Sequence, residues 1–190
     1  MTGDARMKFV ETPLAGCFVV EPEPVRDERG FFARISCVDE LNEHGLDGGF
    51  VQMNMTWNER PLTLRGIHFQ REPHPEAKFV RCTRGRLFDV AVDLREGSAT
   101  RFEWFGVELD AESRRALYIP AGFGHGYLTL EPDTELIYQT TARYHPEAAS
   151  GALWNDAVLG IDWPKDPEVM STADRTWSPI SPDGFSLKSL

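Results

Sequence analysis

Residues 86–94 read RLFDVAVDL, and their side chains alternate in character along the chain. The apolar residues at 88, 90, 92 and 94 would share one face of an extended strand, because successive strand side chains point to opposite sides. Asp89 and Asp93 would then share the other face with Ala91, either turned outward or forming a structural pair. The stretch therefore predicts a β-strand.

Further strand and turn signals surround this stretch. Residues 102–109 and 135–144 continue the β-rich, aromatic alternation. Turn signals recur at Arg84-Gly85, Glu96-Gly97, Pro120-Ala-Gly122 and Pro132-Asp133. Many short strands separated by such turns are typical of an antiparallel sandwich or barrel. Helix signals are short, around residues 39–44 and after Trp163, so the sequence predicts an all-β fold with a few short peripheral helices.

Length and composition narrow the class of protein. The chain has 190 residues, enough for a full core, and is most simply one domain. Its net charge of −10 argues against a nucleic-acid partner. No apolar run approaches the length of a membrane helix, and the N-terminus is too polar to open a signal peptide. Three cysteines without a CxxC pair suit a reducing compartment, so we expect a cytoplasmic protein without a membrane partner.

The stretch of residues 50–57, FVQMNMTW, has the reverse of the usual strand pattern. Gln52, Asn54 and Thr56 share one face, with Val51 and the two methionines opposite. Pattern alone leaves a surface edge strand and a strand lining a wet interior open. Its position just before the histidine strand described next favours a polar, ligand-binding interior.

Two segments carry histidines among the predicted strands. Residues 65–70 read RGIHFQ, and residues 120–125 read PAGFGH, so His68 and His125 are aimed toward one cavity. A metal-binding barrel of this kind usually presents His-x-His, because alternate strand positions share a face. Here Gln70 stands where the second imidazole would be, and glutamine is a poor ligand. His68 is therefore interpreted as a proton-handling base.

The residues around His68 suit proton abstraction next to a carbonyl. Lys78 can stabilise an enolate, and a phenol such as Tyr138 or Tyr144 can return a proton from the other side. A carboxylate behind the imidazole would fix its tautomer. Composition leaves four candidates for that carboxylate: Asp89, Asp93, Asp156 and Asp174.

A series of short motifs, in this order, resembles the dTDP-4-dehydrorhamnose 3,5-epimerase family, which are metal-independent members of the cupin class. The motifs are DERGFF (27–32), Gln52-x-Asn54, LRGIHFQ (64–70), KFVR (78–81), Gly85, DVAVDLR (89–95), IPAGFGHG (119–126), Tyr138, WND (154–156), IDWP (161–164) and Ser171-x-x-Asp174. The resemblance implies a cupin-type jelly-roll β-barrel as a single domain over residues 1–190. It also implies an N-terminal segment and a C-terminal extension packed on the barrel, no cofactor, and a homodimer.

The resemblance implies catalytic roles residue by residue. His68 would remove the proton next to the C4 ketone of a nucleotide-linked 4-keto-6-deoxyhexose, with Asp174 as its carboxylate partner. Lys78 would hold the enolate oxygen, and Tyr138 would reprotonate the carbon from the opposite face. The reaction would invert C3, C5 or both.

The resemblance also implies a set of substrate-binding residues. A diphosphate would contact Arg65 with Gln52 and Asn54, for which a planar guanidinium is well matched. The nucleotide end would lie near Arg29, Phe31 and Tyr144, and His125 would line the same cavity.

Three positions depart from the family pattern. Arg34 stands where an acidic residue is common near the base, and an arginine can only donate hydrogen bonds. If Arg34 contacts the base, cytosine, whose N3 and O2 accept hydrogen bonds, is an alternative to thymine. The other interpretation is that Arg34 is a solvated surface charge. Ala173 and Gln139 replace lysines that often flank the catalytic aspartate and tyrosine. Neither replacement removes a proton-transfer group.

Other functions remain open from the sequence. A metal cupin would use His68, His125 and a carboxylate as ligands, and a 3,4-ketoisomerase on the same fold would shift the ketone. A third alternative is a catalytically idle cupin that binds a sugar nucleotide. The joint presence of His68, Lys78, Tyr138 and Asp174 favours the epimerase, since a binding module needs no acid–base pair.

Overall fold

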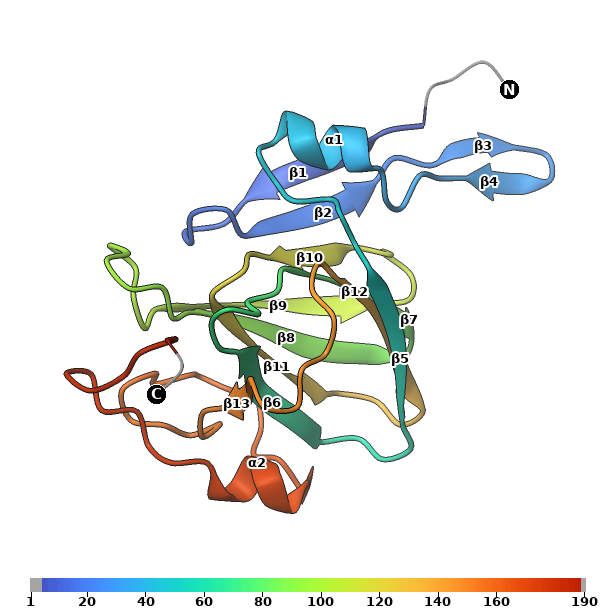
Figure 1. Ribbon diagram of the computed structural model, residues 1–190. Coiled ribbons are helices and arrows are strands. Elements are labelled where there is room, and N and C mark those ends of the chain that lie inside the picture. The colour runs from blue at the N-terminus through green and yellow to red at the C-terminus, as the bar shows by residue number, and fades with distance from the viewer. Residues whose placement is uncertain (1–4, 189–190) are drawn as a thin grey trace.

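Two six-stranded sheets form the body of the protein in the computed structural model, which describes residues 5–188 (Figure 1). The first four residues of the polar N-terminal stretch and the last two residues of the chain lie outside the described part. The first sheet has the order β1 (Met7–Glu11), β2 (Phe18–Pro22), β10 (Ala116–Ile119), β7 (Lys78–Arg84), β12 (Thr134–Thr140) and β5 (Gln52–Asn58). The second has the order β13 (Ala149–Gly151), β6 (Thr63–Gln70), β11 (Phe123–Thr129), β8 (Arg86–Asp93) and β9 (Trp104–Asp110), with β14 (Val169–Met170) also pairing β6.

The predicted fold class is confirmed. Apart from the sheets, residues 5–188 contain a hairpin of β3 (Val25–Asp27) and β4 (Gly30–Phe32) and two short helices, α1 (Val38–Glu43) and α2 (Thr172–Thr176). Two stacked, mainly antiparallel sheets form the double-sheet arrangement of a jelly roll. Within the described residues, strand pairing stays inside each sheet, so the fold is a sandwich rather than one continuously hydrogen-bonded barrel. Neither helix of this part of the chain is long and apolar enough to cross a membrane.

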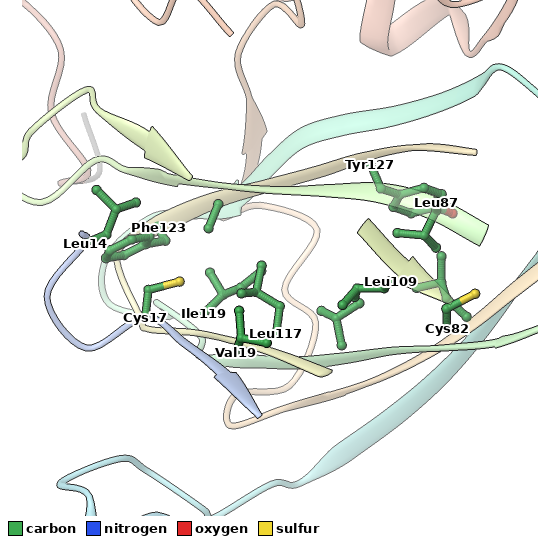
Figure 2. Packing of buried hydrophobic residues seen from close by; sticks show 13 residues of the cluster. Leu14, Cys17, Val19, Cys82, Leu87, Leu109, Leu117, Ile119, Phe123 and Tyr127 are labelled. Carbon is green, nitrogen blue, oxygen red and sulfur yellow. The ribbon is translucent and has the colours of Figure 1, made fainter. Parts of the chain in front are cut away.

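The space between the sheets is filled by apolar side chains (Figure 2). Leu117 and Leu136 of the first sheet pack with Leu87 and Leu109 of the second, and all four are fully buried. Cys17 and Cys82 are free thiols at one per cent exposure, and burial raises the pKa of both to about 12. The two cysteines thus act as small apolar core residues.

The strand at residues 86–93 is buried on both faces. Val90 and Val92 lie in an apolar cluster on the outer side of the second sheet, as their alternation predicted. Asp89 and Asp93 are also fully buried, which corrects the expectation of an outward polar face. A buried carboxylate requires partners: Asp89 has His125, and Asp93 accepts hydrogen bonds from Arg95, Ser98 and Thr100.

The two ends of the chain cover the outer faces of the sandwich. On the first sheet, Leu41 of α1 and Leu46 pack in one cluster with Phe79. On the second sheet, Ile180 and Leu187 of the C-terminal segment join the cluster of Val90 and Val92. A single domain over residues 1–190 stays a prediction.

The strand β5 has its polar face turned inward, as the interpretation of residues 50–57 favoured. Gln52 and Asn54 line a cavity, whereas Val51, Met53, Met55 and Trp57 are exposed by 52, 59, 65 and 51%. Because β5 is the last strand of its sheet, these side chains form an apolar strip at an open edge, here called the β5 strip. Contiguous exposed apolar surface of this kind is a mark of an interaction site.

Candidate active site

A cavity of about 560 Å³ collects most of the predicted catalytic residues. It is lined from both sheets, from the segment 144–150 and from α2. The lining residues are Gln52, Asn54, His68, Phe69, Gln70, Glu76, Lys78, Tyr138, Thr140, Tyr144, Ala149, Ser150, Ala173 and Trp177.

An irregularity in β6 places Arg65 and His68 on one side of the strand. Three residues apart, they would point to opposite faces of a regular strand. Between the pairs Arg65–Tyr127 and His68–His125, however, β6 has one residue more than β11, which is a β-bulge. At the bulge Gly66 has a φ of 128°, and a Cβ there would lie 2.5 Å from the Cα of Gly126. Only glycine fits this position.

His68 and Asp174 form a hydrogen-bonded pair in the site. His68 Nε2 and Asp174 Oδ1 lie 2.5 Å apart, with the imidazole 45% exposed and the carboxylate buried. Ser171, the N-cap of α2, accepts from the Asp174 amide and donates to Asp174 Oδ2 at 2.8 Å. Burial opposes ionisation of Asp174, but the hydrogen bonds and the attraction of His68 outweigh it and lower the pKa of the carboxyl. An ionised Asp174 accepts a hydrogen bond from Nε2–H of His68, so the proton stays on Nε2 and Nδ1 has a free lone pair.

Lys78 is held next to the His68 strand by a carboxylate that the sequence interpretation did not single out. Lys78 Nζ lies 3.2 Å from Glu76 Oε1, and both side chains are nearly buried. Lys78 also donates to the His68 carbonyl at 3.4 Å, and Gln70 Nε2 donates to Glu76 Oε2 at 3.2 Å. Glu76 precedes Lys78 by two residues, and alternate positions of an extended chain share a face, so this spacing could have indicated it.

Tyr138 stands on the wall opposite His68. It belongs to β12 in the first sheet, where it pairs with Asn54 of β5, whereas His68 belongs to β6 in the second. Burial, and secondarily the negative charge of Glu76, raise the pKa of Tyr138 against the opposing effect of Arg65. The phenol therefore stays protonated at neutral pH and can act as an acid.

His125 is not among the residues that line the cavity, although the resemblance placed it there. Its Nε2 lies 2.7 Å from Oδ1 of the fully buried Asp89, and the imidazole is itself nearly buried. His68 and His125 thus each have a carboxylate of their own. Within residues 5–188, the two do not join a set of three side chains close enough to hold one metal ion, so the metal-cupin alternative lacks its ligand set.

The side chains predicted to bind the diphosphate lie on β5 and beside it. Arg65 Nε donates to the buried Asn58 side chain at 2.9 Å, and Gln52 Nε2 donates to Asn54 at 3.1 Å. Gln52 also accepts from the backbone N–H of Tyr144, which is 60% exposed at the cavity rim. Arg65 is exposed and is not one of the residues that line the cavity.

Three predicted nucleotide-binding residues are not part of this cavity. Arg29 and Phe31 lie on the β3–β4 hairpin, which projects from the molecule at the end opposite α2 (Figure 1). Arg34 NH1 lies 2.7 Å from Oε1 of the buried Glu40 of α1. The same carboxylate accepts from the Met7 amide, so Arg34 is part of the N-terminal packing.

Trp177 is a further lining residue, which was not among the predicted site residues. Its ring comes so close to Gly151 that a Cβ on the glycine would lie 2.4 Å from Trp177 Cε2. Trp177 therefore packs directly on the backbone of β13 and closes the cavity beside Asp174. No short-range signal marks this contact, because the C-terminal segment meets β13 only through tertiary packing.

Comparison with known proteins places this geometry in a family. The model of the dTDP-4-dehydrorhamnose 3,5-epimerase family matches residues 11–181. A dTDP-4-dehydrorhamnose 3,5-epimerase of Methanothermobacter thermautotrophicus is 46% identical over 179 residues, covering 93% of this chain and 96% of that protein. A dTDP-4-dehydrorhamnose 3-epimerase of Streptomyces niveus is 38% identical over 170 residues, covering 89% and 82%. The crystal structure of the Bacillus anthracis 3,5-epimerase, with TDP and pyrophosphate bound, has a TM-score of 0.87 at 37% identity and covers 92% of this chain and 100% of its own.

The motifs that suggested the family therefore belong to a match along nearly the whole chain, on a closely similar fold. This protein belongs to the dTDP-4-dehydrorhamnose 3,5-epimerase family.

Proposed function

We propose that this protein inverts C3, C5 or both in a dTDP-linked 4-keto-6-deoxyhexose, as a step of deoxysugar biosynthesis. The observation that carries the proposal is the placement of His68 and Tyr138 on facing sheets around one cavity. A base on one side of a sugar and an acid on the other are what inversion of a carbon requires.

The proposed reaction moves one proton off a carbon and another onto it. His68 Nδ1 takes the proton from the carbon next to the C4 ketone, the C–H electron pair forms a double bond to C4, and the carbonyl π pair moves to the oxygen to give an enolate. The Lys78 ammonium donates a hydrogen bond to that oxygen. The enolate electrons then re-form the C–H bond with the Tyr138 hydroxyl proton on the other face, which inverts the carbon. Proton exchange with water returns both side chains to their starting states.

The nucleotide is proposed to be dTDP. The B. anthracis relative has TDP bound, and Arg65, Gln52 and Asn54 provide polar groups for a diphosphate. The argument for cytosine depended on Arg34, and Glu40 already holds the Arg34 guanidinium inside the N-terminal packing. CDP is therefore the second choice, to be separated by experiment.

NMR in D2O with dTDP- and CDP-linked 4-keto-6-deoxyglucose tests the function directly. We expect the ring protons at C3, C5 or both to be replaced by deuterium in the dTDP sugar, with new signals of the inverted product. Loss at C3 alone would make the enzyme a 3-epimerase like the S. niveus relative. A migrating ketone signal would indicate a ketoisomerase, and tight binding without exchange would contradict any catalytic role.

We also propose that the active unit is a homodimer. The β5 strip is an exposed apolar edge, and the β3–β4 hairpin carries Arg29 and Phe31 away from the cavity of its own chain. Arg81 lines a small pocket together with Met53 of the strip, and its NH1 is buried without a hydrogen-bond partner. A second copy would cover the strip and receive the hairpin at its own nucleotide site.

A cytoplasmic location is proposed as well, and it suits three free cysteines.

Charges on the β5 strip should separate the subunits. A Met53→Glu/Met55→Glu variant is expected to elute as a monomer with light-scattering detection, because burying two carboxylates in an apolar interface is costly. Val158→Glu is the matched control, since Val158 is a partly exposed apolar residue of the C-terminal segment. A double variant that remains dimeric would place the interface elsewhere.

Mixing two inactive variants tests whether the hairpin acts across the dimer. Arg29→Ala chains and His68→Ala chains, unfolded and refolded together, should regain about a quarter of the wild-type activity at low substrate, because half the dimers are mixed and have one intact site each. No recovery would mean that Arg29 serves the site of its own chain, and full activity of Arg29→Ala alone would mean that it serves no site.

Glu76→Gln should change the pH dependence more than the maximal rate. The carboxylate contributes to the raised pKa of Tyr138, so its removal lowers that pKa. As the pH rises, the Tyr138 phenol of the variant should lose its proton earlier than that of the wild-type enzyme. The alkaline fall in activity should therefore begin at a lower pH in the variant. Glu135→Gln, on the same strand as Tyr138, is the control, because the Glu135 carboxylate accepts a hydrogen bond from Thr83 at 2.7 Å and does not line the cavity. An unchanged alkaline limb would contradict a role for Glu76 in setting this acid.

A further inference from the structure

Two histidines and a glutamate gather at the rim of the cavity, and the proposed reaction uses none of them. His74 lies between β6 and β7, and His145 and Glu147 lie between β12 and β13. The imidazole centroids of His74 and His145 are 3.5 Å apart, and one nitrogen or oxygen of each of the three side chains lies within 4.8 Å of the others. We propose that these side chains form a binding site for a divalent transition-metal ion, with zinc as the best match.

The donor set suits such an ion. Two imidazoles and one carboxylate are a common protein ligand set for zinc, and neutral imidazole suits zinc better than it suits magnesium or calcium. His145 Nδ1 and Glu147 Oε1 lie 3.0 Å apart. Tetrahedral zinc bonds of about 2.0–2.2 Å place neighbouring ligand atoms about 3.3–3.6 Å apart, so these two atoms need to separate by only a few tenths of an ångström. His74 completes the set when its ring turns about the side-chain torsions, for which its partial exposure leaves room.

A buried glutamine holds the two histidine backbones in place. Gln70, which is 4% exposed, accepts from the His145 amide at 2.6 Å and donates to the His74 carbonyl at 3.1 Å. The same Nε2, which shares its two hydrogens among its acceptors, also lies 3.1 Å from the carbonyl oxygen of Arg143. One side chain thus fixes both loops before an ion arrives, and such support from behind the ligands raises the affinity of a metal site.

The outer side of the cluster opens to a groove that leaves coordination positions for water. The groove has a volume of about 510 Å³ and includes His74 and Glu147 in its walls. Arg71 brings a positive charge to the groove, but its Nε is directed to Ser150 Oγ at 3.3 Å. Three protein ligands, one of them an exposed carboxylate, correspond to micromolar rather than tighter affinity. A bound ion would link the loops that carry Glu76 and Tyr144 to the cavity wall.

Calorimetric titration of the full chain with zinc chloride, in a non-chelating buffer at neutral pH, tests the site. We expect one ion per chain and a rise in Tm. His145→Ala and Glu147→Gln should each weaken binding by at least about tenfold. Glu147 is 70% exposed, so the glutamine variant leaves the fold intact even if the alanine variant does not. His44→Ala and His68→Asn should keep the wild-type affinity, which separates this site from other surface histidines and from the catalytic pair.

Cobalt provides a second, independent measurement. Bound Co²⁺ should give visible absorption without the intense thiolate band that cysteine ligation would produce, because the proposed ligands are nitrogen and oxygen. Wild-type affinity in a His74→Ala/His145→Ala double variant would overturn the proposal. So would the absence of saturable binding in the wild-type protein.

Discussion

Replacing His68 by alanine should abolish the exchange of substrate protons with D2O. His68 is the imidazole that faces the cavity, and its partner Asp174 leaves Nδ1 free to accept a proton. A positioned general base contributes about 10²–10⁴-fold to a rate, and here it is needed for the first bond to break. The measurement is the initial rate of deuterium incorporation at C3 and C5, followed by NMR with the dTDP-linked 4-keto-6-deoxyglucose.

Asp174→Asn should have a similarly large effect through a different cause. An asparagine NH2 group can donate a hydrogen bond to Nε2 of His68. This favours the tautomer with the proton on Nδ1, so Nδ1 can no longer accept a proton from the substrate. Ser171 would still cap α2, so the backbone should stay in place. His44→Ala, which removes an exposed histidine stacked on Phe9, is the matched control and should exchange at the wild-type rate. Full exchange by His68→Ala would refute the assignment of the base.

Short-range patterns in the sequence were sufficient for several strands and for one wall of the cavity. Alternation predicted the strand that became β8, and the polar face of residues 50–57 was placed toward a ligand because it precedes the histidine strand. The same alternation left Asp89 and Asp93 either turned outward or paired, and the outward alternative was wrong, because both carboxylates are fully buried with partners. A strand pattern reports which side chains share a face, whereas coverage of that face depends on segments far along the chain.

The His68–Asp174 pair shows the limit of the sequence more sharply. His68 and Asp174 are 106 positions apart, so their contact came from a family resemblance and not from spacing. The β6 bulge at Gly66 was also invisible to strand periodicity, although it sets Arg65 and His68 on one side. Arg29 and Phe31 lie on a hairpin away from the cavity of their own chain, and the alternation of side chains does not report where a hairpin projects.

A Tyr138→Phe variant should exchange substrate protons with solvent without inverting the carbon. His68 and Asp174 remain, so the proton can still leave to give the enolate, and Lys78 can still bind the enolate oxygen. Phenylalanine has no acidic proton, so protonation from the Tyr138 side should slow by about 10²–10⁴-fold. The proton then returns mainly from the His68 side, as deuterium, and restores the original configuration.

The measurement separates exchange from inversion in a single NMR time course. Wild-type enzyme should form inverted product as deuterium enters, whereas Tyr138→Phe should give deuterated substrate with little product. Tyr144→Phe is the control, because Tyr144 lies at the exposed rim and is proposed to contact the nucleotide end. Inversion by Tyr138→Phe at the wild-type rate would mean that water or another group supplies the second proton. Loss of both exchange and inversion would instead assign Tyr138 to enolate formation, since only the first step is common to the two signals.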